Sequence, residues 1–172
     1  MDYILLAEQF FNGFQLGIIL FLVAAGLTLI FGIMDLVNLA HGTLYMFGAF
    51  FAATFVQLTD SLVLGMILTL PAMLIAGLIL ELSVLRTLYE RDHLDQVLAT
   101  FGLIIFFNEL FLIVWGAEGT GINLPPYLSG LITLPGGITV PDYRVVIIIS
   151  GLLVAVLLYL LVSKTRIGML IR

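Results

Sequence analysis

The chain has 172 residues, of which 62% are hydrophobic and 10% charged, with a formal net charge of −5. So apolar a composition cannot form a water-facing surface, which excludes a soluble globular domain and predicts an all-α polytopic membrane protein. No basic patch exists for nucleic acid, and without cysteine there is neither a disulfide framework nor a thiolate nucleophile.

The first apolar run covers residues 10–33 and is long enough to cross about 30 Å of hydrocarbon as a helix. Asp2 and Glu8 precede it in place of a cationic segment, so the run reads as a retained span and not as a cleaved signal. Gly13 and Gly17 form a G-x-x-x-G step. Such a step predicts close packing against a neighbouring helix.

A polar segment, residues 34–42, interrupts the apolar sequence with Asp35, Asn38 and His41, followed by Gly42. These polar residues either share one helical face or cap the ends of two half-helices that meet here. Polar groups at membrane depth require protein or a water-filled cavity around them. We therefore predict a broken or re-entrant segment that contributes to a translocation path. The alternative for His41 is a hydrogen bond to a carbonyl group that closes the break.

Two further runs follow the polar segment. Residues 42–58 form a short apolar run, in which Gly48 and Ala52 again give the small-x-x-x-small spacing of packed membrane helices. Residues 62–85 form the next span and contain Pro71, which removes one backbone hydrogen bond and predicts a kink.

The fourth run covers residues 97–115 and follows the only dense charge cluster, residues 86–95, which we expect to be a solvated loop. Glu109 lies inside this run, where a carboxylate facing lipid costs about 2.5–3.5 kcal/mol. It either makes a polar or cationic contact along the path or makes an interhelical hydrogen bond. We favour the interhelical bond, because polar residues often join membrane helices.

Residues 116–144 hold four of the five prolines and cannot form one helix, so they predict an extramembrane loop. Within it, residues 131–134 and 138–140 flank Pro-Gly-Gly and predict a small β-hairpin, a possible lid over the bundle. Residues 145–162 form the last apolar run.

Charge placement gives the orientation. Residues 86–91 and 164–172 carry cations and lie two spans apart, so both should face the cytoplasm. Five crossings satisfy this, with a periplasmic N-terminus and residues 116–144 on the periplasmic side. All 172 residues would form one transmembrane domain.

Several motifs resemble the permease subunits of branched-chain amino-acid ABC importers. The resemblance covers most of the chain, and its most specific element is Asn-Leu-Ala-His-Gly at residues 38–42. The other matching stretches are Gly-Leu-Thr-Leu-Ile-Phe-Gly at 26–32, Met-Phe-Gly-Ala at 46–49, Ala-Thr-Phe-Gly-Leu at 99–103, which contains Thr100, and Thr-Arg-Ile-Gly-Met at 165–169. We add Thr100 to the predicted path residues Asp35, Asn38, His41, Gly42 and Glu109.

The resemblance implies a multi-pass protein of the bacterial inner membrane. Its partners would be a second permease subunit, two cytoplasmic ATPase subunits and a periplasmic amino-acid-binding protein. No phosphate-binding loop of the G-x-x-x-x-G-K-[ST] type occurs, so no cofactor is expected here and ATP would be bound by the partner subunits. Permeases of the family continue through a coupling segment and more helices, so we expect this chain to be an N-terminal portion that does not transport by itself.

Four alternatives stay open at this point. A urea or short-amide permease of the same family would share every quoted motif, because a fold does not fix a substrate. A secondary transporter would show paired broken helices, of which one break is visible here. An intramembrane enzyme would need a nucleophile with its base, or a metal triad, and neither is visible, so we predict no catalytic and no metal-binding residue. The fourth alternative is a purely structural membrane subunit.

Overall fold

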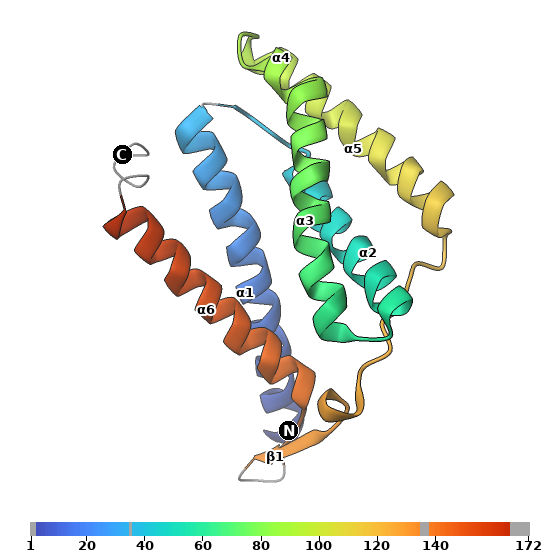
Figure 1. Cartoon of the computed structure of the whole chain (residues 1–172). Coiled ribbons are helices and arrows are strands. Elements are labelled where there is room, and N and C mark those ends of the chain that lie inside the picture. The colour runs from blue at the N-terminus through green and yellow to red at the C-terminus, as the bar shows by residue number, and fades with distance from the viewer. Residues whose placement is uncertain (1–2, 35, 135–137, 166–172) are drawn as a thin grey trace. The chain divides into compact units, whose positions relative to one another are not determined.

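The computed structural model describes residues 3–34, 36–134 and 138–165. Among these residues five helices are long and apolar enough to cross a membrane, which confirms the predicted number of spans. Contacts divide the chain into two units, the first made of residues 1–33 with 124–172 and the second of residues 34–123, and each has its own packing. The spanning helices are α1 (Tyr3–Met34), α2 (His41–Thr59), α3 (Leu62–Leu80) with its continuation to Leu88, α5 (His93–Trp115) and α6 (Asp142–Lys164) (Figure 1).

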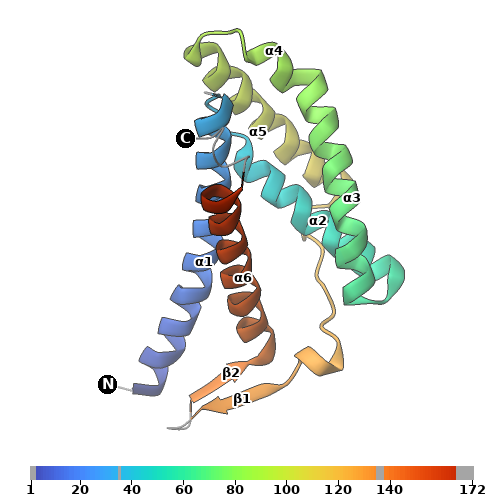
Figure 2. The same cartoon turned by 60° about the vertical axis from the view of Figure 1, so that its left-hand side comes forward.

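In the first unit, α1 and α6 lie side by side in both views (Figures 1 and 2). Gly151 of α6 is buried, and a Cβ added there would overlap the side chain of Ile18 in α1. The guanidinium of Arg144, about two turns nearer the start of α6, donates to the Asn12 side-chain oxygen. A glycine on α6 and a polar bond therefore join these two helices.

A β-hairpin precedes α6 in the same unit. Strands β1 (Leu131–Leu134) and β2 (Ile138–Pro141) pair antiparallel with Leu131 opposite Pro141, which confirms the predicted hairpin, although its Pro-Gly-Gly turn lies outside the described residues. The short 3-10 helix η2 (Pro126–Leu128) comes before it. The sequence predicted that the last helix begins at residue 145, whereas it begins at Asp142. Pro141 is the last residue of β2 and directly precedes the helix, where its missing N–H is not needed, and Asp142 in the first turn complements the helix dipole.

The second unit is built on the α2–α3 pair, which turns sharply at Asp60 in a left-handed conformation (φ 51°). Ser61 caps α3 by accepting a hydrogen bond from the amide of Leu64 at 3.4 Å. Aromatic rings join α2 to α5, with the Phe47 and Phe111 ring centroids 4.6 Å apart. At the far end of this contact the Trp115 indole donates to Thr54 Oγ1 at 2.8 Å.

Two boundaries in the second unit differ from the sequence prediction. α3 ends at Leu80, and the chain continues as a π-helix, η1 (Glu81–Leu85), and a short turn, α4 (Arg86–Leu88), past the predicted end of the span at residue 85. Pro71 lies inside α3, and the kink predicted there stays a prediction. The predicted loop 86–95 was therefore too long, since only residues 89–92 separate α4 from α5. Charged residues at the ends of helices are compatible with helical geometry because their side chains reach water. The charged side chains of this cluster are exposed, as predicted.

The ends of α1 also differ from the prediction. It begins at Tyr3, seven residues before the predicted start at residue 10, because the polar residues of this stretch are good helix formers in contact with water. It ends at Met34, and the next helix begins at His41. Residues 36–40 are not helical, which confirms the predicted break.

Candidate functional site

The non-helical segment 36–40 lies against the first half of α5. The amide of Val37 donates to Gln96 Oε1 at 3.0 Å, and the amide of Leu39 donates to Thr100 Oγ1 at 3.2 Å. Alternate residues of an extended chain are about 6.6 Å apart, and residues four apart on a helix are about 6 Å apart. The two spacings match, so Gln96 and Thr100 of α5 supply acceptors to alternate amides of the segment, as the carbonyl groups of a neighbouring β-strand would.

Thr100 is fully buried, and its hydroxyl acts as both a hydrogen-bond acceptor and a donor. Its Oγ1 accepts from Leu39 and donates to the carbonyl of Gln96 at 2.7 Å. A hydroxyl has one donor and two acceptor positions, so this arrangement satisfies a polar group that would be costly to bury alone.

Asn38 is 2% exposed and shapes the entry into α2. Its Oδ1 accepts from the amide of Ala40 at 3.0 Å, and its carbonyl oxygen accepts from the amide of His41 at 3.3 Å. An Asn side chain bonded to the backbone two residues on is an Asx turn, which starts a helix as a backbone turn would. Asn38 therefore acts before the helix, and the predicted alternative of one shared helical face is wrong.

The predicted path residues are brought together only in part. Asn38 and Thr100 lie at the break on either side of Leu39, whereas Asp35 lies outside the described residues. His41 is half-buried at the first position of α2, and Gly42 beside it is exposed. Glu109 is exposed on α5, about 13 Å along the helix from Thr100 at 1.5 Å per residue.

The residues predicted for helix packing have different surroundings. Gly13 and Gly17 of α1 are exposed, and a Cβ at either would meet nothing within 4 Å. Close packing at these two positions stays a prediction. In α2, Ala52 is buried, and a Cβ on Gly48 would lie 4.0 Å from Met73 Sδ, which is ordinary contact.

Gln96 was missed by the sequence prediction although it has the largest set of contacts at the break. It is 3% exposed, and its Nε2 donates to the carbonyl oxygens of Leu88 at 3.2 Å and Arg91 at 3.1 Å. A detectable signal was present, because Gln96 and Thr100 are spaced i, i+4 and so share one face of an apolar helix. The sequence prediction placed Gln96 just outside the span.

These contacts also fix the level of the break. Through Gln96 the segment 36–40 is tied to the turn 89–92 that joins α4 to α5, and this turn is exposed and charged. The break therefore lies at the same level as the end of α4 and the start of α5. Within it, Leu36 and Ala40 are buried in protein. Polar backbone at such a level is tolerated because side chains of the protein satisfy it.

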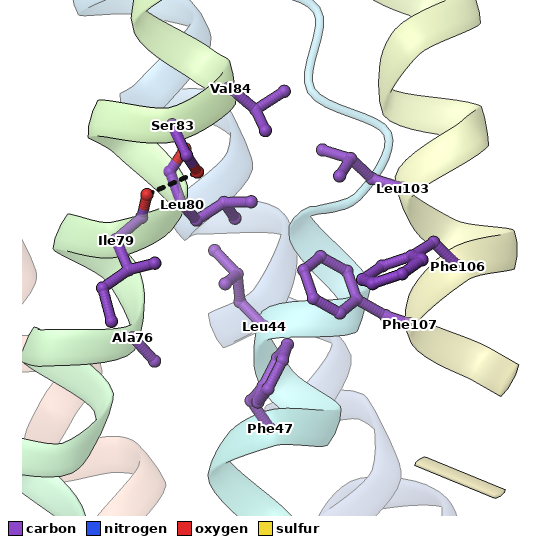
Figure 3. Close-up of a pocket in the computed structure, with 10 residues that line it drawn as sticks. All are labelled: Leu44, Phe47, Ala76, Ile79, Leu80, Ser83, Val84, Leu103, Phe106 and Phe107. Atoms are coloured by element: carbon purple, nitrogen blue, oxygen red, sulfur yellow. Dashed lines mark hydrogen bonds between the residues drawn. The ribbon is translucent and has the colours of Figure 1, made fainter. Parts of the chain in front are cut away.

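An apolar cavity of ≈ 340 Å³ lies beside the break, between α2, the end of α3 with η1, and α5 (Figure 3). Its only hydroxyl belongs to Ser83, which donates to the carbonyl of Ile79 at 2.6 Å. Such walls accept hydrocarbon and offer nothing to pair with a charged group. Several wall residues also pack against the buried cluster around Leu36. The cavity is lined by Leu44, Phe47, Ala76, Ile79, Leu80, Ser83, Val84, Leu103, Phe106 and Phe107.

A family model described as "Branched-chain amino acid transport system / permease component" matches residues 9–172. The chain is 28% identical over 174 residues to the high-affinity branched-chain amino acid transport system permease protein BraD of Pseudomonas aeruginosa, covering 94% of this chain and 56% of BraD. It is 26% identical to LivH of Salmonella typhimurium and 27% identical to LivH of Escherichia coli K12, two permease proteins with the same description, each over 72% of this chain and 42% of the relative. The chain thus spans about half the length of these relatives. No solved structure gives a significant match.

Proposed function

The chain belongs to the branched-chain amino acid transport permease family, and on that basis we propose that it forms part of the translocation path of an ATP-driven importer. The proposed substrates are branched-chain or related amino acids, as the descriptions of BraD and LivH name them. The proposed partners are a second permease subunit, two cytoplasmic ATPase subunits and a periplasmic binding protein. The family match over residues 9–172 carries this proposal.

The break supports a role in transport. Non-helical backbone is held there by buried side chains of α5, as helices interrupted for a translocation path require. His41 and Gly42 are the accessible residues next to it, and they begin α2 immediately after the Asx turn of Asn38. In this proposal Asn38 and Thr100 hold the backbone, and His41 with Gly42 forms the part of the break that a substrate passes.

The charge distribution supports an orientation. Arg86 begins α4 and Arg91 lies in the α4–α5 turn, and Lys164 ends α6, two spans later. Cationic residues near span ends favour the cytoplasmic side. We therefore place the α4–α5 turn and the end of α6 in the cytoplasm, with the N-terminus and the β-hairpin in the periplasm of a bacterial inner membrane.

Uptake into proteoliposomes tests the proposal. The vesicles would contain the full permease parent together with its permease, ATPase and binding-protein partners, and radiolabelled leucine and urea would be compared with and without ATP. ATP-dependent leucine uptake is expected. Urea uptake in its place would move the protein to the amide-carrying branch of the family, and ATP-independent uptake would indicate a secondary transporter.

Variants at the break complete this test. Asn38→Leu and His41→Leu should each reduce uptake more than they reduce the amount of protein in the membrane, since the apolar flanks suffice for insertion. Gly77→Ala in α3 is a suitable control, because a Cβ at that position meets nothing within 4 Å. Normal uptake by the double variant would show that the break only connects two helices.

A further inference from the structure

The buried amide of Gln96 contacts two separate segments of the chain. Its oxygen accepts from the amide of Val37 in the non-helical segment 36–40 at 3.0 Å. Its nitrogen donates to Leu88 at the end of α4 and to Arg91 in the following turn, at 3.2 and 3.1 Å. One side chain therefore bridges the break and the α4–α5 turn.

The bridge uses the full donor capacity of the side chain. A primary amide has two N–H donors and one carbonyl acceptor, and both donors and the acceptor have partners here. The backbone amide of Gln96 also donates to Asp92 at 3.1 Å, which anchors the start of α5 to the same turn. With 3% exposure, water has little access to compete for these bonds.

We propose that Gln96 is a positioning residue that makes the α4–α5 turn and segment 36–40 move as one piece. The turn exposes charged side chains, including Glu90 and Asp92, whereas segment 36–40 is mostly buried. A force applied to the exposed turn would thus reach the buried break through two carbonyl oxygens and one backbone amide. Coupling between sites requires such a shared physical element.

This link does not depend on what the protein transports. Its consequence for transport does rest on the proposed function: a cytoplasmic partner that displaces the turn would shift the segment that begins α2. In that case Gln96 affects the rate of transport and not the binding of substrate, because its amide group is engaged by backbone atoms of Val37, Leu88 and Arg91.

A double-mutant cycle measures the link. The sequence contains no cysteine, so one cysteine replacing Leu39, whose side chain is 45% exposed, reports on the segment by its rate of maleimide labelling. A glycine inserted after Arg91 displaces the turn. We expect the insertion to raise the labelling rate roughly two- to tenfold when Gln96 is present, the range that corresponds to loss of one hydrogen bond. Gln96→Met should itself label faster than the parent, because the amide of Val37 loses its acceptor. In that variant the insertion should add little, so the two changes are not additive.

Gln96→Glu separates the two halves of the bridge. A carboxylate still accepts from Val37 but cannot donate to the two carbonyl groups of the turn. The turn end of the bridge is then lost, so the glycine insertion should no longer change the labelling rate at position 39, whatever that rate is before the insertion. This variant also keeps the test decisive if Gln96→Met fails to fold.

Gln57→Met is the matched control. Gln57 also donates from Nε2 to a backbone carbonyl, that of Gly121 at 2.9 Å, but it contacts neither the turn nor the break. In that background the insertion should act as in the parent. An equal effect of the insertion in the Gln96 and Gln96→Met backgrounds would overturn the proposal.

Transport gives an independent readout. In the assembled importer Gln96→Met should lower the maximal rate of uptake and leave the KM unchanged, and a raised KM with an unchanged maximal rate would contradict the positioning role. If the parent shows no ATP-dependent uptake, the proposed function fails, while the labelling cycle still decides whether Gln96 couples the turn to the break.

Discussion

Gly65 of α3 lies directly against the backbone of Val56 in α2: a Cβ added to Gly65 would lie 2.7 Å from the Val56 nitrogen and 2.9 Å from its Cα. The contact lies one turn beyond the Asp60 turn, where α2 and α3 are closest in sequence. Backbone atoms cannot move aside as a flexible side chain does, so only glycine permits this approach.

We therefore expect Gly65→Ala to destabilise the α2–α3 pair by about 1–3 kcal/mol, the usual cost of overpacking a close contact. Thermal unfolding in detergent would measure the loss. Gly77→Ala, in the same helix but with open space around its Cβ, should have little effect. Equal stability of the two variants would show that the helices separate easily at Gly65.

Thr100→Val should loosen the break. Valine has nearly the shape of threonine but leaves the part-buried amide of Leu39 without its acceptor, which costs about 0.5–1.5 kcal/mol, the net contribution of a typical hydrogen bond. Faster hydrogen exchange at the Leu39 amide would report the change. Thr100→Ser keeps the hydroxyl and should preserve slow exchange, so fast exchange in both variants would contradict a role for the hydrogen bond.

The orientation is tested by labelling single cysteines from outside the cell. Cysteines replacing Ser61 and Ser129 should react with an impermeant reagent in intact cells freed of their outer membrane. Cysteines replacing Thr87 and Ser163 should react only after permeabilisation, because the cationic residues near them favour the cytoplasm. Labelling of Ser129→Cys only after permeabilisation would overturn the periplasmic placement of the hairpin.

Tyr89 should titrate late. Burial, the hydrogen bond that its hydroxyl donates to Glu81, and the charge of Glu81 raise the pKa of Tyr89 from 10.0 to about 12. A raised pKa means that the folded protein holds this proton more tightly than the unfolded chain. The resulting stability is complete below pH 10 and is lost as the pH rises towards about 12.

Tyrosinate absorbance would measure this titration. The late component should disappear in Tyr89→Phe and shift to lower pH in Glu81→Gln, which keeps an acceptor but removes the charge. A late component that survives in Tyr89→Phe would belong to another tyrosine.

Glu109→Gln should assemble normally and leave uptake within about twofold of the parent. Glu109 is exposed on α5 and away from the break, and a carboxylate facing lipid would cost about 2.5–3.5 kcal/mol. We therefore expect it to bond a helix of another subunit, and glutamine keeps such a bond. A large fall in leucine uptake without loss of assembly would instead place Glu109 on the path.

The sequence by itself determined the membrane class, the five spans, the hairpin and the interruption near Asn38. These follow from local properties: apolar length, the turn chemistry of proline and glycine, and the cost of polar residues at membrane depth. The family resemblance also came from the sequence, and the family model confirms it over residues 9–172.

Only the tertiary structure decided which residues hold the break. Gln96 and Thr100 lie about 60 residues after the segment that they bind, and no local pattern links them to Val37 and Leu39. The tertiary structure also decided which glycines pack against a neighbouring helix. Gly13 and Gly17 have the motif spacing but lie open, whereas Gly65 and Gly151, which stand in no quoted motif, meet a neighbouring helix. Spacing along one helix describes a face, but whether that face is covered depends on which helix lies opposite it.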